Sequence, residues 1–126
     1  MKRRTAREKA FQILFQMDVN DIAPQEAIEH VLEEEAIDAF LSELVYGVNK
    51  NKQAIDEKIT ANLEKWTLER LATVEKTVLR IAAFELMFES ETPQGVVINE
   101  AVELAKLYGD DKSGKFVNGV LSKVIS

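Results

Sequence analysis

The sequence of 126 residues contains no cysteine, only two prolines and only five glycines. Without cysteine the chain has no disulfide, no thiol nucleophile and no cysteine zinc site, which is compatible with the cytosol. Because turn-forming residues are scarce, long helices are expected rather than many short strands. No apolar stretch reaches the length of a bilayer span, and the basic N-terminus lacks the apolar segment of a signal peptide. We therefore expect one cytoplasmic, all-α domain.

The sequence also lacks the residue groups that catalysis needs. His30 is the only histidine, with no second histidine or cysteine to share a metal and no serine at nucleophile spacing. Residues 33–35 are three adjacent glutamates, which cannot converge on one ion from a helix. Residues 109–115 match part of a phosphate-binding loop, but they follow a helix and Phe116 stands where magnesium needs Ser or Thr. The sequence predicts a protein that is not an enzyme and needs no cofactor or metal.

Apolar residues at helical spacing divide the chain into seven helices with short links, which predicts a compact all-α bundle. Pro24 suits the start of a helix, and Gly109 suits the end of one. Two packed helical halves, residues 1–64 and 65–126, are expected within this single domain. The expected helices cover residues 5–19, 24–32, 37–48, 50–63, 74–89 and 96–108, and a last one from 115 onward.

Three finer expectations rest on local patterns. Thr5 is expected to cap the first helix, with Glu8 three residues later completing a capping box. Residues 110–114 are expected to form a loop before the last helix. Trp66, the only tryptophan, is expected in the core where the two halves meet.

Positive charge is in the minority, with 16 Lys and Arg against 22 Asp and Glu, yet it gathers at the N-terminus. The first nine residues carry a charge of +4, which leaves −10 on the other 117 residues of a chain whose net charge is −6. A cationic start on an anionic body indicates a local site for a polyanion. Arginine suits such a site because a guanidinium contacts phosphate in two places and stacks on bases. The alternative is a solvated terminus, and charge alone leaves both open.

Two phenylalanines lie where either packing or binding would explain them. Phe15 lies off the main apolar stripe of the first helix, so it either flanks the core or contacts a partner. Phe116 lies beside Lys115 at the expected start of the last helix. It would either stack on a single-stranded base near a helix N-terminus or pack against Tyr108, and the residues alone favour packing.

Four segments, taken in order, resemble the motifs of the NusB family of transcription antitermination factors. The resemblance spans essentially the whole chain, and four motifs in register are more specific than any one of them. They are the N-terminal residues 3–16 (RRTAREKAFQILFQ), residues 74–86 (VEKTVLRIAAFEL), residues 93–106 (PQGVVINEAVELAK) and residues 115–121 (KFVNGVL).

The resemblance implies an all-α fold of two three-helix bundles and no catalysis. It implies that the protein binds single-stranded boxA RNA of ribosomal or phage transcripts together with NusE, a small-subunit ribosomal protein. It also implies that this pair joins NusA, NusG and RNA polymerase. Some members form homodimers that mask the RNA surface. By position it also moves Phe116 from the core to the RNA site. The implied RNA-binding residues are Lys2, Arg3, Arg4, Arg7, Lys115 and Phe116, and the implied NusE-facing residues are Phe15 and Glu75.

Other functions compete with this interpretation. A helical protein-interaction module would use the arginines only as surface charge. NusB-like domains also occur at the front of some RNA cytosine methyltransferases, of which this chain would be a fragment because 126 residues leave no room for the catalytic domain. A helix-turn-helix DNA regulator is a weaker alternative, since no helix presents a polar, base-reading face after a tight turn.

Overall fold

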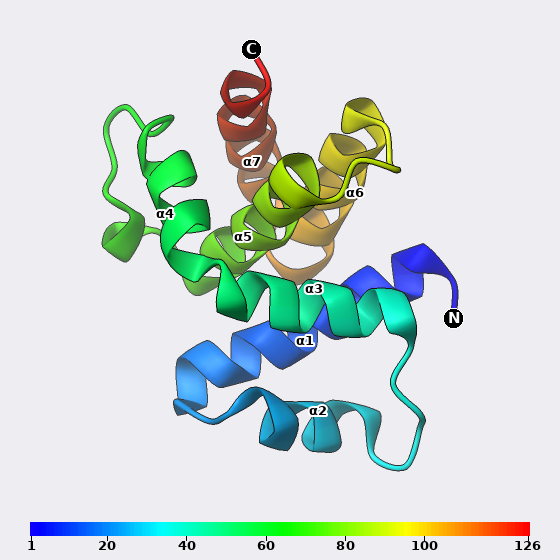
Figure 1. The fold of residues 1–126 in the computed structure, drawn as a ribbon. Helices are drawn as coiled ribbons and strands as arrows, with labels where there is room; N and C mark the ends of the chain where they lie inside the picture. The colour runs from blue at the N-terminus through cyan, green and yellow to red at the C-terminus, as the bar shows by residue number, and fades with distance from the viewer.

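The computed structural model describes residues 1–126 and contains seven α-helices and no strand, which confirms the predicted all-α class (Figure 1). None of the helices combines the length and apolar character that crossing a membrane requires. The helices are α1 (Arg3–Asn20), α2 (Pro24–Leu32), α3 (Ala39–Lys50), α4 (Lys52–Thr60), α5 (Thr73–Phe88), α6 (Gln94–Tyr108) and α7 (Asp111–Val124), with a short 3-10 helix at Leu68–Arg70.

Helix α5 lies at the centre of the bundle. It contacts α1 and α3 on one side and α4, α6 and α7 on the other, while α2 packs chiefly against α1 (Figure 1). Its buried residues, from Thr77 to Glu85, belong to nearly every face of the helix, as its apolar sequence predicts. The buried apolar side chains of all seven helices form one continuous core.

The close crossing of α3 and α5 depends on Gly47. A Cβ atom at this position would overlap the ring of Phe84, which is buried in the core. The missing side chain therefore lets an aromatic ring of α5 lie directly against the backbone of α3. A glycine inside a helix usually lowers helix stability, so here close packing accounts for it.

Two helix starts differ from the sequence-based expectations. Helix α1 begins at Arg3, before Thr5, and its N-cap residue Lys2 provides no side-chain hydrogen bond, so the expected capping box is wrong. Helix α7 begins at Asp111, so residues 111–114 of the loop expected at 110–114 are instead its first turn. Its cap is Asp110, whose carboxylate accepts hydrogen bonds from the backbone N–H (2.8 Å) and hydroxyl (3.1 Å) of Ser113.

The expectation of a buried Trp66 is also wrong, because 55% of this residue is exposed. Trp66 lies in the segment between α4 and α5. The chain turns toward the core only at Leu68, two residues after it. Leu68 is partly buried against the core and Leu71 is 7% exposed, so these two leucines anchor the segment. Trp66 consequently remains outside, next to the 3-10 helix.

Candidate nucleic-acid interface

The arginine-rich start of the chain is the first turn of α1, which extends across the end of α3 toward α5 and α6 (Figure 1). Lys2 is exposed just before the helix. The chain amino group of Met1 lies 3.6 Å from the carboxylate of Asp38, the residue that caps α3 through the backbone N–H groups of Phe40 and Leu41. The cationic segment is therefore held on the fold from its first residue.

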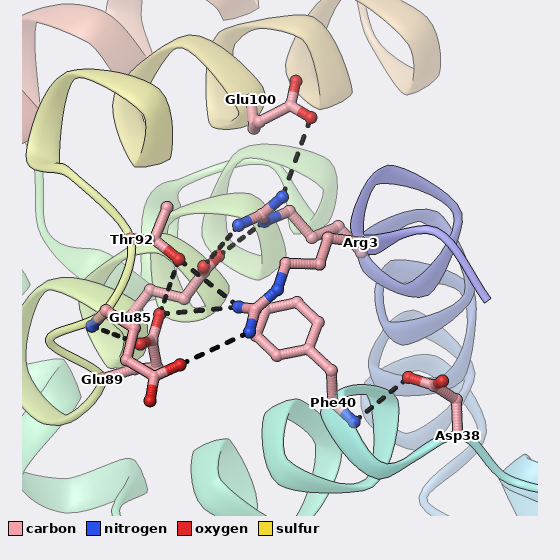
Figure 2. A network of polar contacts seen from close by, with 9 residues as sticks. Arg3, Asp38, Phe40, Glu85, Glu89, Thr92 and Glu100 are labelled. Atoms are coloured by element: carbon pink, nitrogen blue, oxygen red, sulfur yellow. Dashed lines mark hydrogen bonds and ion pairs between the residues drawn. The ribbon is translucent and has the colours of Figure 1, made fainter.

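Arg3 is half exposed and contacts three kinds of group at once. Its guanidinium lies 4.2 Å from the centre of the Phe40 ring, donates a 3.4 Å hydrogen bond to Thr92 and approaches Glu89 at 3.9 Å. Figure 2 shows Arg3 in one network with Phe40, Glu89 and Thr92. The aromatic face and the carboxylate hold the planar guanidinium in a fixed orientation, while its outer edge remains open to solvent.

The carboxylate of Glu89 is well satisfied within this network. It accepts hydrogen bonds from the hydroxyl of Thr92 at 2.8 Å and from the backbone N–H of Glu91 at 2.6 Å. Burial raises the pKa of Glu89, but these hydrogen bonds and the charge of Arg3 more than offset that effect, so the pKa lies below its usual value. Glu89 is therefore a stable anion that stabilises the charge on Arg3.

Arg4 pairs with Glu100 of α6 through two parallel hydrogen bonds of 3.1 and 2.8 Å. Hydrogen bonding to Glu100 and the charge of that carboxylate raise the pKa of Arg4. The Arg4 side chain is 69% exposed, so solvent and salt reach the pair. A phosphate oxygen is chemically similar to a carboxylate oxygen, and the exposed fork of Arg4 is suited to exchange one for the other.

Arg7 is in a different environment from its two neighbours, because it is 4% exposed. It donates two hydrogen bonds, of 2.9 and 2.7 Å, to the carboxylate of Glu85, which is 1% exposed. A second carboxylate, Glu100, lies 3.7 Å from it. Burial lowers the pKa of Arg7, but the hydrogen bonds and charge of Glu85 more than offset this, so its pKa lies above the usual value. In this conformation Arg7 joins α1 to α5, and its Nε and Nη2 atoms are both occupied by Glu85.

The structure separates the residues assigned by position to RNA into two places. Lys2, Arg3 and Arg4 lie at the N-terminal end of α1. Lys115 and Phe116 lie in the second turn of α7, which begins at Asp111, and they line a groove with the segment between α4 and α5. Lys115 is exposed, and Phe116 is partly buried against the core. Figure 1 places the start of α1 and the α4–α5 segment on opposite sides of the molecule.

The residues assigned by position to NusE lie on α1 and α5. Phe15 is partly buried, with its ring centre 5.6 Å from that of Phe11, which in turn stacks on Tyr108 at 4.2 Å. Glu75 is partly exposed in the first turn of α5. Val19, one turn after Phe15, is 57% exposed, and the sequence reasoning did not single it out. The sequence pattern that could have identified Val19 is an apolar residue near the end of a helix, outside the buried stripe.

Comparison with known proteins places this architecture in a family. The NusB family matches residues 4–126, which is nearly the whole chain. The transcription antitermination protein NusB of Bacillus licheniformis is 57% identical over 126 residues, covering 100% of this chain and 98% of its own length. The chain belongs to the NusB family. Because NusB-family proteins are non-catalytic, membership also confirms the prediction that this chain is not an enzyme.

Two solved NusB structures share the fold. One contains NusB and NusE in complex with double-stranded RNA, and its matching chain has a TM-score of 0.88 and 36% identity, covering 97% of this chain and 94% of that one. The other is T. maritima NusB, with a TM-score of 0.88 and 40% identity, covering 98% of this chain and 90% of that one. The arrangement of the seven helices is therefore that of the NusB family.

Proposed function

We propose that this protein is a transcription antitermination factor of the cytoplasm that binds boxA-type single-stranded RNA together with NusE and supports processive transcription of ribosomal RNA operons. NusA, NusG and RNA polymerase would be reached through this pair. One observation carries the proposal: the fold and sequence match a NusB chain solved with NusE and RNA over nearly their whole lengths. Identity of 57% to an antitermination protein supports the same role.

The proposed RNA contacts begin at the exposed cations of α1. Arg3 and Arg4 present guanidinium groups that carboxylates hold in place, and Lys2 adds an exposed ammonium group just before them. Binding of RNA is then an exchange, in which a phosphate takes the place of the Glu100 carboxylate on Arg4. Arg7 was also expected to contact RNA, but its burial with Glu85 supports a structural role in fixing the angle of α1.

The proposed NusE contacts come from the C-terminal half of α1 and the first turn of α5. Phe15 offers an aromatic surface that is only partly covered, and Val19 extends the apolar surface by one turn. Glu75 adds a partly exposed charge from the first turn of α5. Aromatic residues with adjacent polar groups are frequent anchors of protein interfaces. RNA and NusE would therefore occupy different parts of the same face of α1.

The proposal is tested by the salt dependence of RNA affinity in Arg4→Ala. Each phosphate contact with a single strand contributes a slope of about −0.7 to log affinity against log salt. We expect the variant to bind boxA-type RNA more weakly and with a shallower slope, because one exposed contact is lost without a change in the core. Lys50→Ala, an exposed cation at the end of α3, is the matched control. Equal affinity and slope in Arg4→Ala and wild type would remove Arg4 from the RNA site.

A further inference from the structure

A pocket of about 200 Å³ opens at the C-terminal end of α1, and the end of α3, the start of α4 and the first two turns of α5 complete its walls. Figure 1 shows the end of α1 and the junction of α3 with α4 on the same side of the molecule, away from the N-terminus. The apolar lining residues are Leu14, Met17, Ile22 and Val48. This volume is below the range of small-molecule sites, about 300–1,000 Å³, and suits an apolar side chain of a protein partner.

The polar lining of the pocket carries an uncompensated negative charge. Asp18 and Asp21 are exposed, and neither takes part in an ion pair within the chain. Arg80 is already neutralised, because it donates hydrogen bonds of 2.8 and 3.0 Å to the carboxylate of Asp56. Lys52 is then the single unpaired cation of the lining, against two unpaired acids.

These two acids begin a strongly acidic stretch of the chain. Residues 18–38 contain eight Asp and Glu and no Lys or Arg. They carry a charge of −8, and because the whole chain carries −6, the other 105 residues together carry +2. Seven of the eight acids are exposed, and only Asp38 has an ion-pair partner. The stretch continues from the pocket through α2, which packs against α1, so a partner that approaches the pocket meets negative charge and a basic one is favoured.

The pocket lies on a different flank from the residues proposed to contact NusE. Residues advance about 100° each around a helix, so Glu75 and Thr77, which lines the pocket, point about 160° apart on α5. On α1, Phe15 lies beside Phe11, which stacks on Tyr108 of α6, whereas the pocket is completed by α3 and α4. The cations proposed to contact RNA are at the other end of α1 (Figure 1). A molecule in the pocket is therefore compatible with both NusE and RNA on their proposed surfaces.

We propose that this pocket docks a basic segment of a protein other than NusE, which inserts one large apolar side chain and lays lysine or arginine beside Asp18 and Asp21. An apolar anchor in a pocket, with opposite charges around it, is the arrangement that carries affinity and specificity in protein interfaces. RNA does not fit this site, because the unpaired carboxylates repel phosphate. The protein thus has a third docking surface, through which a further protein joins the same assembly.

The first test locates the binding of a defined peptide. The probe is a short peptide in which leucines alternate with lysines and arginines, and it is added to isotope-labelled protein while nuclear magnetic resonance follows the backbone amide signals. One control peptide has serine in place of leucine, and a second has glutamate in place of the basic residues. We expect only the basic leucine peptide to shift the signals of Met17, Asp18, Asp21 and Ile22. Absence of these shifts, or equal shifts with the serine peptide throughout residues 18–38, would overturn the proposal.

Charge variants separate the pocket from the rest of the acidic stretch. Asp18→Asn combined with Asp21→Asn removes both lining acids, and asparagine suits position 21 because the φ of Asp21 is 51°. Glu26→Gln combined with Glu29→Gln removes the same charge from exposed positions of α2 outside the lining. We expect peptide affinity to fall about five- to tenfold in the first variant and less than about twofold in the second. Equal losses in both would contradict a docking site at the pocket.

A lysine in the lining provides a test of the opposite sign. We expect Lys52→Gln to bind the peptide about two- to threefold more tightly, because it removes the unpaired cation of the pocket. Lys58→Gln, an exposed position in the last turn of α4, is the matched control and should leave the affinity unchanged. Weaker binding in Lys52→Gln would contradict the proposed contact between basic residues and the two aspartates.

Competition identifies the occupant. We expect the peptide to bind equally well when NusE and boxA-type RNA are present. Displacement of the peptide by NusE would overturn the proposal and assign the pocket to the NusE surface. Self-association of the wild-type chain that disappears in the Asp18 and Asp21 variant would overturn it in favour of a second copy. Failure of RNA and NusE binding leaves the peptide result unaffected, because neither is present in the first test.

Discussion

The buried pair of Arg7 and Glu85 gives the sharpest prediction about stability. Removing the Arg7 side chain leaves the carboxylate of Glu85, which is 1% exposed, without its two hydrogen-bond donors. Breaking a buried ion pair at one partner costs about 3–5 kcal/mol, because a charge stays buried without compensation. Glu100, 3.7 Å from Arg7, would lose the same partner but retain Arg4.

This cost is large compared with the stability of a domain of this size, which is about 5–15 kcal/mol in total. For Arg7→Ala we expect urea unfolding, followed by helical circular dichroism, to show a loss of about 3–5 kcal/mol. The melting temperature should fall by roughly 10–20 °C. The exposed pair of Arg4 with Glu100 is the internal comparison, and we expect the midpoint of Arg4→Ala to stay close to that of wild type.

A double variant distinguishes a buried charge from a lost packing contact. Arg7→Met with Glu85→Leu replaces both charges with apolar side chains, so no charge remains buried without a partner. We expect the double variant to be clearly more stable than Arg7→Ala, since apolar replacement of a buried pair is often neutral or favourable. An Arg7→Ala variant that loses less than about 1 kcal/mol would refute the reasoning, because that is the range of solvent-exposed pairs.

Three further predictions concern the partner surface, a cap and a helix crossing. Phe15→Asp should weaken NusE binding in calorimetry and spare the helix content, and full affinity would remove Phe15 from that surface. Hydrogen bonds from the backbone N–H and hydroxyl of Ser113 hold the pKa of Asp110 below its usual value. The ionised Asp110 cap therefore stabilises the folded state above about pH 4, and this contribution is lost as the pH falls through the lowered pKa. Asp110→Ala should therefore be less stable than wild type at pH 7, and the difference between the two should shrink in acid; a difference independent of pH would contradict this. Gly47→Ala should destabilise the fold by about 1–3 kcal/mol, because its Cβ overlaps the Phe84 ring, and an unchanged urea midpoint would show that the helices shift apart freely.

Most helices could be predicted because their signals are local. Pro24 starts α2, and Gly109 ends α6, so the bounds of these helices follow from residues next to them. The start of α7 was wrong because acids and glycine in a row indicate a loop, whereas Asp110 acts as a cap and the next residues continue as helix. The place of Trp66 was wrong for a related reason, since two leucines a few residues later occupy the core instead.

The arginine cluster shows where sequence reasoning stops. The charge of the segment is visible in the sequence, but the partners of its arginines lie in α5, α6 and the link between them. Arg7 meets Glu85 78 positions later, and no local pattern in α1 predicts that contact. One signal was available: Glu85 is an acid within the most apolar helix, and a buried acid requires a buried cation.

The central claim is that this protein recognises a specific single-stranded RNA with the help of NusE. The most direct measurement is fluorescence anisotropy with a labelled boxA-type RNA and a scrambled RNA of equal length, each with and without NusE. The account predicts tighter binding to the boxA-type RNA and a further increase in affinity when NusE is present. Equal, weak and salt-sensitive binding to both RNAs, unchanged by NusE, would contradict it and leave only a cationic N-terminus.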